Sequence, residues 1–188
     1  MNASNTTILI ISFALCCGCA QKSAPINDVG FDSPDSIHSL EGCFTNHSEG
    51  ENKRVGQYLS QIIWPTAKFD PFLVKAIHVV AVDEKPLRVA AVTDGNVIHE
   101  SLFVEGQDFY LKSGPISDKK RAFVSFAYPP GNPFIGVGHE TNKLGIDKNG
   151  DGRFQQNGAF VGTAFLFIPI AGTGEESYRF TRNINLCK

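Results

Sequence analysis

Short apolar segments that alternate with polar turn residues run along the chain from about residue 37 to residue 188. Such segments, rich in β-branched and aromatic side chains, are typical of strands. We predict strands at 40–44, 74–82, 87–92, 97–104, 109–112, 121–128, 134–139, 144–146, 153–156, 159–170 and 178–181. Only 57–63 has a helical pattern, enough for a turn or two. The pattern predicts an all-β, mainly antiparallel fold: a single meander that forms a small barrel or a sandwich.

The clearest local signal is Asp94-Gly95-Asn96, which separates two apolar runs. An Asp-Gly pair adopts the positive φ angles that a tight hairpin turn requires. We therefore expect 87–92 and 97–104 to pair as a hairpin.

The N-terminus carries an apolar run, Ile8–Leu15, followed by a cluster of small residues and cysteines at 16–20. This order is typical of a secretory signal peptide, here residues 1–18, and the run is too short to span a bilayer as a helix. No Lys or Arg precedes Lys22, although such signals normally begin with positive charge. Cleavage after Ala20 and an uncleaved anchor are the alternatives.

The segment Leu15-Cys16-Cys17-Gly18-Cys19-Ala20 resembles the lipobox of bacterial lipoproteins, in which a small residue precedes the cysteine that is acylated. Gly18-Cys19 is the part of the segment that matches this pattern. The resemblance implies that Cys19 is acylated and becomes the mature N-terminus. Cys16 stands where that motif has Leu, so Cys17 is an alternative acceptor. Ala20, rather than Asp, implies sorting to the outer membrane, facing the periplasm.

Residues 19–36 are rich in Pro, Gly, Ser, Asn and Asp and lack an apolar period. Such a segment is expected to be a flexible tether with a span on the order of 25 Å. Residues 37–188 would then form a single β-rich globular domain.

The balance of charged residues argues against one class of binding partner. Lys and Arg total 17 against 19 Asp and Glu, a net charge of −2. This balance argues against a nucleic-acid partner, because phosphate-binding surfaces carry a positive excess.

Outside the N-terminal segment, Cys43 and Cys187 are the remaining cysteines. An exported protein matures where disulfides persist, so we predict that they pair; two free thiols are the alternative. Their separation of 187 − 43 = 144 residues would enclose nearly the whole domain. The bridge would bring 40–44 against 179–186, because paired cysteine Cα atoms lie within about 7 Å.

The loop at 147–152 matches the first half of an EF-hand calcium loop, with Asp147, Asn149 and Asp151 at ligand positions one, three and five and Gly152 at position six, where the loop turns sharply. The twelfth position is Gly158, where a bidentate Glu is needed. A hairpin turn uses the same residue types. We expect a plain turn, with Ca²⁺ as a weak alternative cofactor.

The pairs His99-Glu100 and His139-Glu140 lack the helical spacing of zinc hydrolases. Adjacent side chains on a strand point to opposite faces, so we expect surface positions, with a site assembled across strands as the alternative. The sequence contains no nucleophile elbow, phosphate loop or dinucleotide motif, which favours a non-enzymatic protein.

The run at 165–172 is apolar on both faces of a strand. Such a segment is either covered by another part of the chain or offered to a protein, lipid or ligand.

The chain resembles short envelope lipoproteins of proteobacteria through Gly18-Cys19, Leu40–Phe44, Pro169–Gly172 and Tyr178–Phe180. What this implies is a location in the bacterial cell envelope. Leu40–Phe44 is also similar to the first strand of lipocalins, with Phe44 in place of their Trp. We therefore expect a lipid-anchored, non-enzymatic protein that binds or supports an envelope component; a carrier of a small apolar ligand is the alternative.

Overall fold

A computed structural model describes residues 19–33, 35–49, 57–109, 116–117, 121–125, 134–164 and 168–188. Along the chain its elements are β1 (Cys19–Ser23), η1 (Ile37–Leu40), β2 (Gly42–Thr45), α2 (Leu59–Ile63), η2 (Pro71–Leu73), β3 (Ala76–Ala81), β4 (Pro86–Thr93), β5 (Asn96–Val104), β6 (Ile116–Ser117), β7 (Arg121–Ser125), β8 (Phe134–Ile146), β9 (Gly152–Ala164), β10 (Ile168–Phe180) and η3 (Ile184–Cys187). The predicted signal peptide lies outside the described residues.

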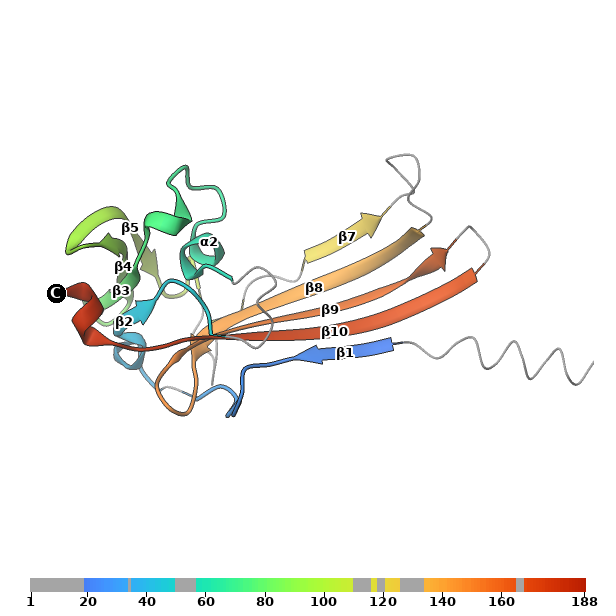
Figure 1. Ribbon diagram of the computed structural model, residues 1–188, viewed down its shortest axis with the longest axis horizontal. Helices are drawn as coiled ribbons and strands as arrows, with labels where there is room; N and C mark the ends of the chain where they lie inside the picture. The colour runs from blue at the N-terminus through green and yellow to red at the C-terminus, as the bar shows by residue number, and fades with distance from the viewer. Residues whose placement is uncertain are drawn as a thin grey trace, which may run out of the picture. The chain divides into compact units, whose positions relative to one another are not determined.

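The strands form two sheets, which confirms the all-β, mainly antiparallel fold (Figure 1). One sheet has the order β2-β3-β4-β5, a meander of sequential antiparallel neighbours. The other has the order β1-β10-β9-β8-β6, and β7 also pairs with β8. The predicted helical turn is confirmed as α2.

The chain divides into two compact units, where we had expected one domain at 37–188. Unit 1 contains Met1–Ser23, Lys119–Thr141 and Gln156–Glu176, and unit 2 contains Ala24–Asp118, Asn142–Gln155 and Ser177–Lys188. Strands β8, β9 and β10 contribute residues to both.

Unit 2 holds the buried apolar core, which lies between two sheets as in a sandwich. Strand β4 contributes Leu87, Val89 and Ala91, whose spacing of two residues places them on one face. Phe154 and Phe180 reach the same core from β9 and β10. The other members are Ile37, Leu40, Phe44, Leu59, Val74, Ile77, Phe109 and Ile146.

The predicted hairpin at Asp94-Gly95 is confirmed. Asp94 has φ 47° and Gly95 has φ 77°, the two positive angles of a tight turn whose twist matches its strands. Strands β4 and β5 pair on either side of it, from Thr93↔Asn96 to Pro86↔Val104.

Three strands are longer than the pattern predicted, at 13 residues each. The expected breaks at 140–143, 157–158 and 171–177 lie inside β8, β9 and β10, and the expected strand at 159–170 is wrong because β9 ends at Ala164 and β10 begins at Ile168. Glycine, Asn and Thr residues suggested turns there, but neighbours on both sides of β9 continue the ladder through them. The predicted segments 110–112 and 126–128, and residues 165–167 of the apolar run at 165–172, lie outside the described residues.

The segment at 19–36 differs from the flexible tether we expected. Residues Cys19–Ser23 form β1, which pairs in parallel with β10. Within unit 2, Asp28 makes an ion pair with Arg153, whose side chain is 6% exposed, and a second bond of that pair measures 2.9 Å. Arg179 donates to the carbonyls of Ile26 and Asn27 at 3.3 and 2.8 Å. Composition could not reveal these arginine partners, which lie more than a hundred residues away.

Candidate functional site

Cys19, the predicted lipidation site, is the first residue of β1. The parallel register runs from Cys19↔Gly172 to Ser23↔Glu176 without a shift. The backbone that follows Cys19 is therefore fixed to the edge of the unit 1 sheet.

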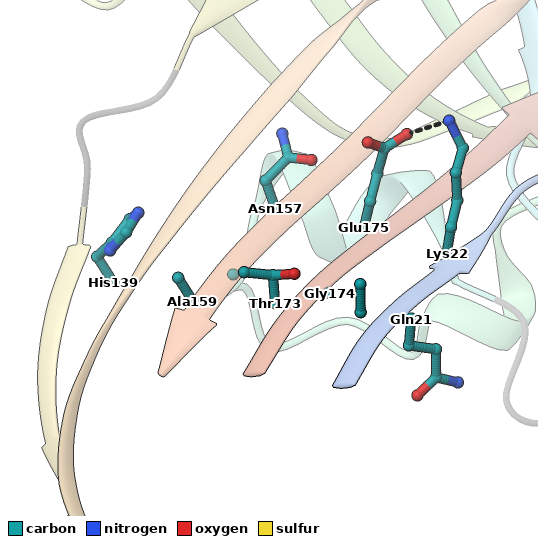
Figure 2. Close-up of a pocket in the computed structure, with 10 residues that line it drawn as sticks. Gln21, Lys22, His139, Asn157, Ala159, Thr173, Gly174 and Glu175 are labelled. Atoms are coloured by element: carbon teal, nitrogen blue, oxygen red, sulfur yellow. Dashed lines mark ion pairs between the residues drawn. The ribbon is translucent and has the colours of Figure 1, made fainter. Parts of the chain in front are cut away.

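A shallow depression of about 420 Å³ lies on one face of that sheet, within unit 1 (Figure 2). Four strands build it, since its lining comes from β1, β8, β9 and β10. The lining residues are Ala20, Gln21, Lys22, His139, Asn157, Gly158, Ala159, Thr173, Gly174 and Glu175. We call this depression the β1 trough.

The β1 trough is open, and its lining combines a few polar side chains with exposed carbon atoms. Lys22 Nζ lies 2.9 Å from Glu175 Oε1, across the β1–β10 pairing. Figure 2 shows Lys22, Glu175 and Asn157 rising on the same side of the strands, whereas Gln21 points to the other side. The lysine side chain is 65% exposed, so the pair contributes little to stability. The trough offers a hydroxyl, an amide, an imidazole and a charge pair, set among apolar atoms of the strands.

Sequence reasoning did not assign the residues of the β1 trough as a group. Lys22 and Glu175 are 153 positions apart, and only the parallel pairing brings them together. His139 had been singled out, but as part of a His-Glu pair. No feature of the sequence signals that a strand starting at Cys19 adds to β10.

The predicted disulfide between Cys43 and Cys187 is present in unit 2, with Cα atoms 6.0 Å apart. Cys43 is fully buried in β2. The predicted approach of the C-terminal segment to 40–44 is also confirmed: Asn183 N–H donates to Cys43 O at 2.7 Å, and Thr45 N–H donates to Thr181 O at 2.9 Å. The bridge thus fastens the segment after β10 to the first strand of the other sheet.

The loop at 147–152 is the turn between β8 and β9. Asp147 is buried, and its Oδ1 accepts from the N–H groups of Asn149 and Asp151 at 2.8 and 3.0 Å. Its Oδ2 lies 3.3 Å from Arg179 Nε. Asp151 Oδ1 accepts from the Arg182 N–H at 2.8 Å. The carboxylates thus stabilise the turn itself, as the turn interpretation requires.

The two His-Glu pairs lie apart. His99 packs in unit 2 against Trp64 and Phe69, with ring centroids 4.9 and 5.2 Å away, whereas His139 lines the β1 trough in unit 1. Among the described residues, no group of three or more His, Cys, Asp or Glu side chains could hold a metal ion.

One carboxyl has a distinctly shifted acidity. The Ala81 N–H donates to Glu41 Oε1 at 2.9 Å, and this bond, with a second from His38, holds the pKa of Glu41 below its ordinary value. A hydrogen bond to the charged form favours that form. Glu41 therefore links η1 to the end of β3 while ionised.

No protein-family model, curated protein or solved structure matches this chain. Within the part of the chain that the structure describes, no helix has the length and apolar character to cross a membrane.

Proposed function

We propose that this protein is a non-enzymatic lipoprotein of the bacterial cell envelope, acylated at Cys19 and anchored in the outer membrane facing the periplasm. The observation that supports this proposal most is that all five residues from Cys19 to Ser23 pair with β10, so Cys19 is part of the folded sheet. Cleavage before Cys19 leaves every residue of β1 in the mature protein. Cleavage after Ala20 removes two of its five residues and leaves their register partners, Gly172 and Thr173, without a neighbour from β1.

The disulfide supports the same location. Structural disulfides persist in oxidising compartments such as the periplasm and are rare in the cytosol. Cys43 and Cys187 connect two segments that are far apart in sequence, so their bridge has a structural role in unit 2.

The β1 trough suits the binding of a polar envelope component. It is formed by several strands, and it begins one residue after the proposed anchor, at Ala20. The alternative, a carrier of a small apolar ligand, loses support because the interior of unit 2 is occupied by packed apolar side chains.

Metabolic labelling with palmitate tests the anchor. The wild-type chain and Cys17→Ala should incorporate label, and Cys19→Ala should not. Cys17→Ala is a matched control because it removes the neighbouring thiol and leaves the proposed acceptor intact. Label that persists in Cys19→Ala would refute the assignment, and label lost only in Cys17→Ala would move it to Cys17.

Fractionation of the envelope tests the location. Acylated protein should sediment with the outer membrane and be released by detergent but not by high salt. Recovery of the wild-type protein in the soluble periplasmic fraction would contradict a lipid anchor.

A further inference from the structure

A lipid anchor on Cys19 fixes how far the unit 1 sheet lies from the membrane surface. Each residue from Cys19 to Ser23 is paired with one residue of Gly172–Glu176, so no flexible linker separates the anchor residue from β10. In a protein acylated at Cys19, the backbone at Gly172 must therefore lie at the level of the membrane surface.

The sheet extends beyond that level. Strand β10 begins at Ile168, four residues before Gly172, which corresponds to about 13 Å at roughly 3.3 Å per residue. Its neighbour β9 ends at Ala164, and a connection this short joins antiparallel strands. Val161, three residues before the end of β9, therefore lies near the level of Ala171, three residues after the start of β10. Both are about as close to the membrane surface as Cys19, or closer.

Strand β8 reaches the same end of the sheet. A Cβ built on Gly136 would lie 2.5 Å from the Val161 carbonyl oxygen, so β8 and β9 approach closely there. Val137 follows directly. Only glycine, which has no Cβ, fits at position 136.

This end of the sheet is apolar and exposed. Val161 and Val137 are 61% and 58% exposed, and Pro169 and Ala171 are exposed beside them. Side chains two positions apart share a face, so Val161 lies on the face of Ala159 and Asn157, which line the β1 trough. One face of unit 1 thus changes from apolar at the Cys19 end to polar side chains such as Asn157 and Glu175 farther along the strands.

We infer that the Cys19 end of the unit 1 sheet, marked by Val137, Val161 and Ala171, dips into the interfacial layer of a phospholipid bilayer. The inference rests on the proposed acylation of Cys19, because the anchor sets the depth. A lipid surface is favoured over a protein partner, since the apolar patch lies at the anchor's own level and becomes polar with distance from it.

A fluorescent probe can report this contact. Val161→Cys, carrying an environment-sensitive dye, is prepared as acylated protein in vesicles of phosphatidylethanolamine and phosphatidylglycerol. The disulfide and the acylation occupy the native cysteines of the mature chain. The dye should emit at shorter wavelength than in detergent-free buffer and be quenched at least threefold more by nitroxide-bearing lipid than by an aqueous quencher.

Asn157→Cys is the matched control. It lies on the same strand and face, about 13 Å farther from the apolar end, and its dye should favour the aqueous quencher. Val137→Cys provides a second test from β8 and should behave as Val161→Cys does. Equal quenching at 161 and 157, or burial of the 161 dye only after an envelope protein extract is added, would overturn the inference.

The mass of the protein in the same preparation shows whether it is acylated, and this distinguishes failure of the membrane contact from failure of the proposed anchor. Acylated protein with an aqueous dye at 161 overturns the membrane contact and leaves the proposed function standing. Protein without acyl chains refutes the proposed anchor, and the membrane contact that depends on it falls as well.

Discussion

Loss of the Cys43–Cys187 bridge should strongly destabilise unit 2. The perturbation is either a reductant or the double substitution Cys43→Ala/Cys187→Ala. Alanine is preferred to serine because Cys43 is fully buried, and a hydroxyl there would need a hydrogen-bond partner. The folded contacts around β2 and η3 should otherwise persist, including the bond from Asn183 N–H to Cys43 O.

The size of the effect follows from the 144-residue separation of the two cysteines. Closing a loop of this length removes about 17 cal/mol/K of entropy from the unfolded chain, or roughly 5 kcal/mol at 25 °C. Measured effects are often smaller, so we expect a loss of about 3–5 kcal/mol in the free energy of unfolding. With a slope near 4 kcal/mol/M, the guanidinium midpoint should fall by about 1 M.

Fluorescence of Trp64 provides the assay. It is the single tryptophan of the chain, it packs against the core of unit 2, and its Nε1 donates to Ser101 Oγ at 2.9 Å. Its signal therefore reports that unit alone. The double alanine variant should be insensitive to reductant, which shows that the reductant acts on this bridge. A midpoint that moves by less than about 0.3 M would refute the entropic argument.

Four further outcomes are expected. Asn46→Ala should cost about 3 kcal/mol, because its amide is 1% exposed and makes three hydrogen bonds to backbone groups. Asp28→Ala should cost about 3 kcal/mol, since it leaves the Arg153 cation buried without this carboxylate. Because the pKa of Glu41 is lowered by folding, its stabilising effect should be present above about pH 4.3 and be lost as the pH falls below it. A calcium chelator should leave the melting temperature unchanged, because Asp147 already accepts two N–H groups.

Each of these four predictions has a control variant or a measurement that tests its physical reason. Asn96→Ala removes an exposed asparagine from the hairpin and should cost less than about 0.5 kcal/mol in the same melts. Adding Arg153→Met to Asp28→Ala should recover stability, because it removes the buried cation whose carboxylate is missing. In acid titrations Glu41→Gln should flatten the loss below about pH 4.3, and an unchanged slope would contradict the shifted pKa. A drop of several degrees on adding chelator would restore the calcium hypothesis.

Much of the fold could be predicted from short-range sequence signals, such as turn residues and runs of β-branched side chains. The Asp94-Gly95 turn and the β-branched runs beside it identify the meander of unit 2, because these residues favour one backbone conformation wherever they occur. Cys43 and Cys187 could be paired by elimination. The helical turn before Trp64 was also visible in the sequence.

Long-range pairing was not predictable. The sequence around β1 has the composition of a linker, and its order comes from β10 and from Arg153 and Arg179, which are distant in sequence. For the same reason the β1 trough was missed. Gly158 suggested a break, although it lies inside β9. Gly136, which lies in β8, permits close approach of a neighbouring backbone.

The N-terminal pairings also constrain when the chain can fold. Strand β1 has its partner in β10, and β2 is bridged to Arg182 and joined to Cys187, so both wait for the last residues to become available. A chain released gradually from its N-terminus cannot complete the six-stranded sheet or form the disulfide until almost its full length has emerged. Such long-range closure is slow, and it keeps the early segments open during synthesis.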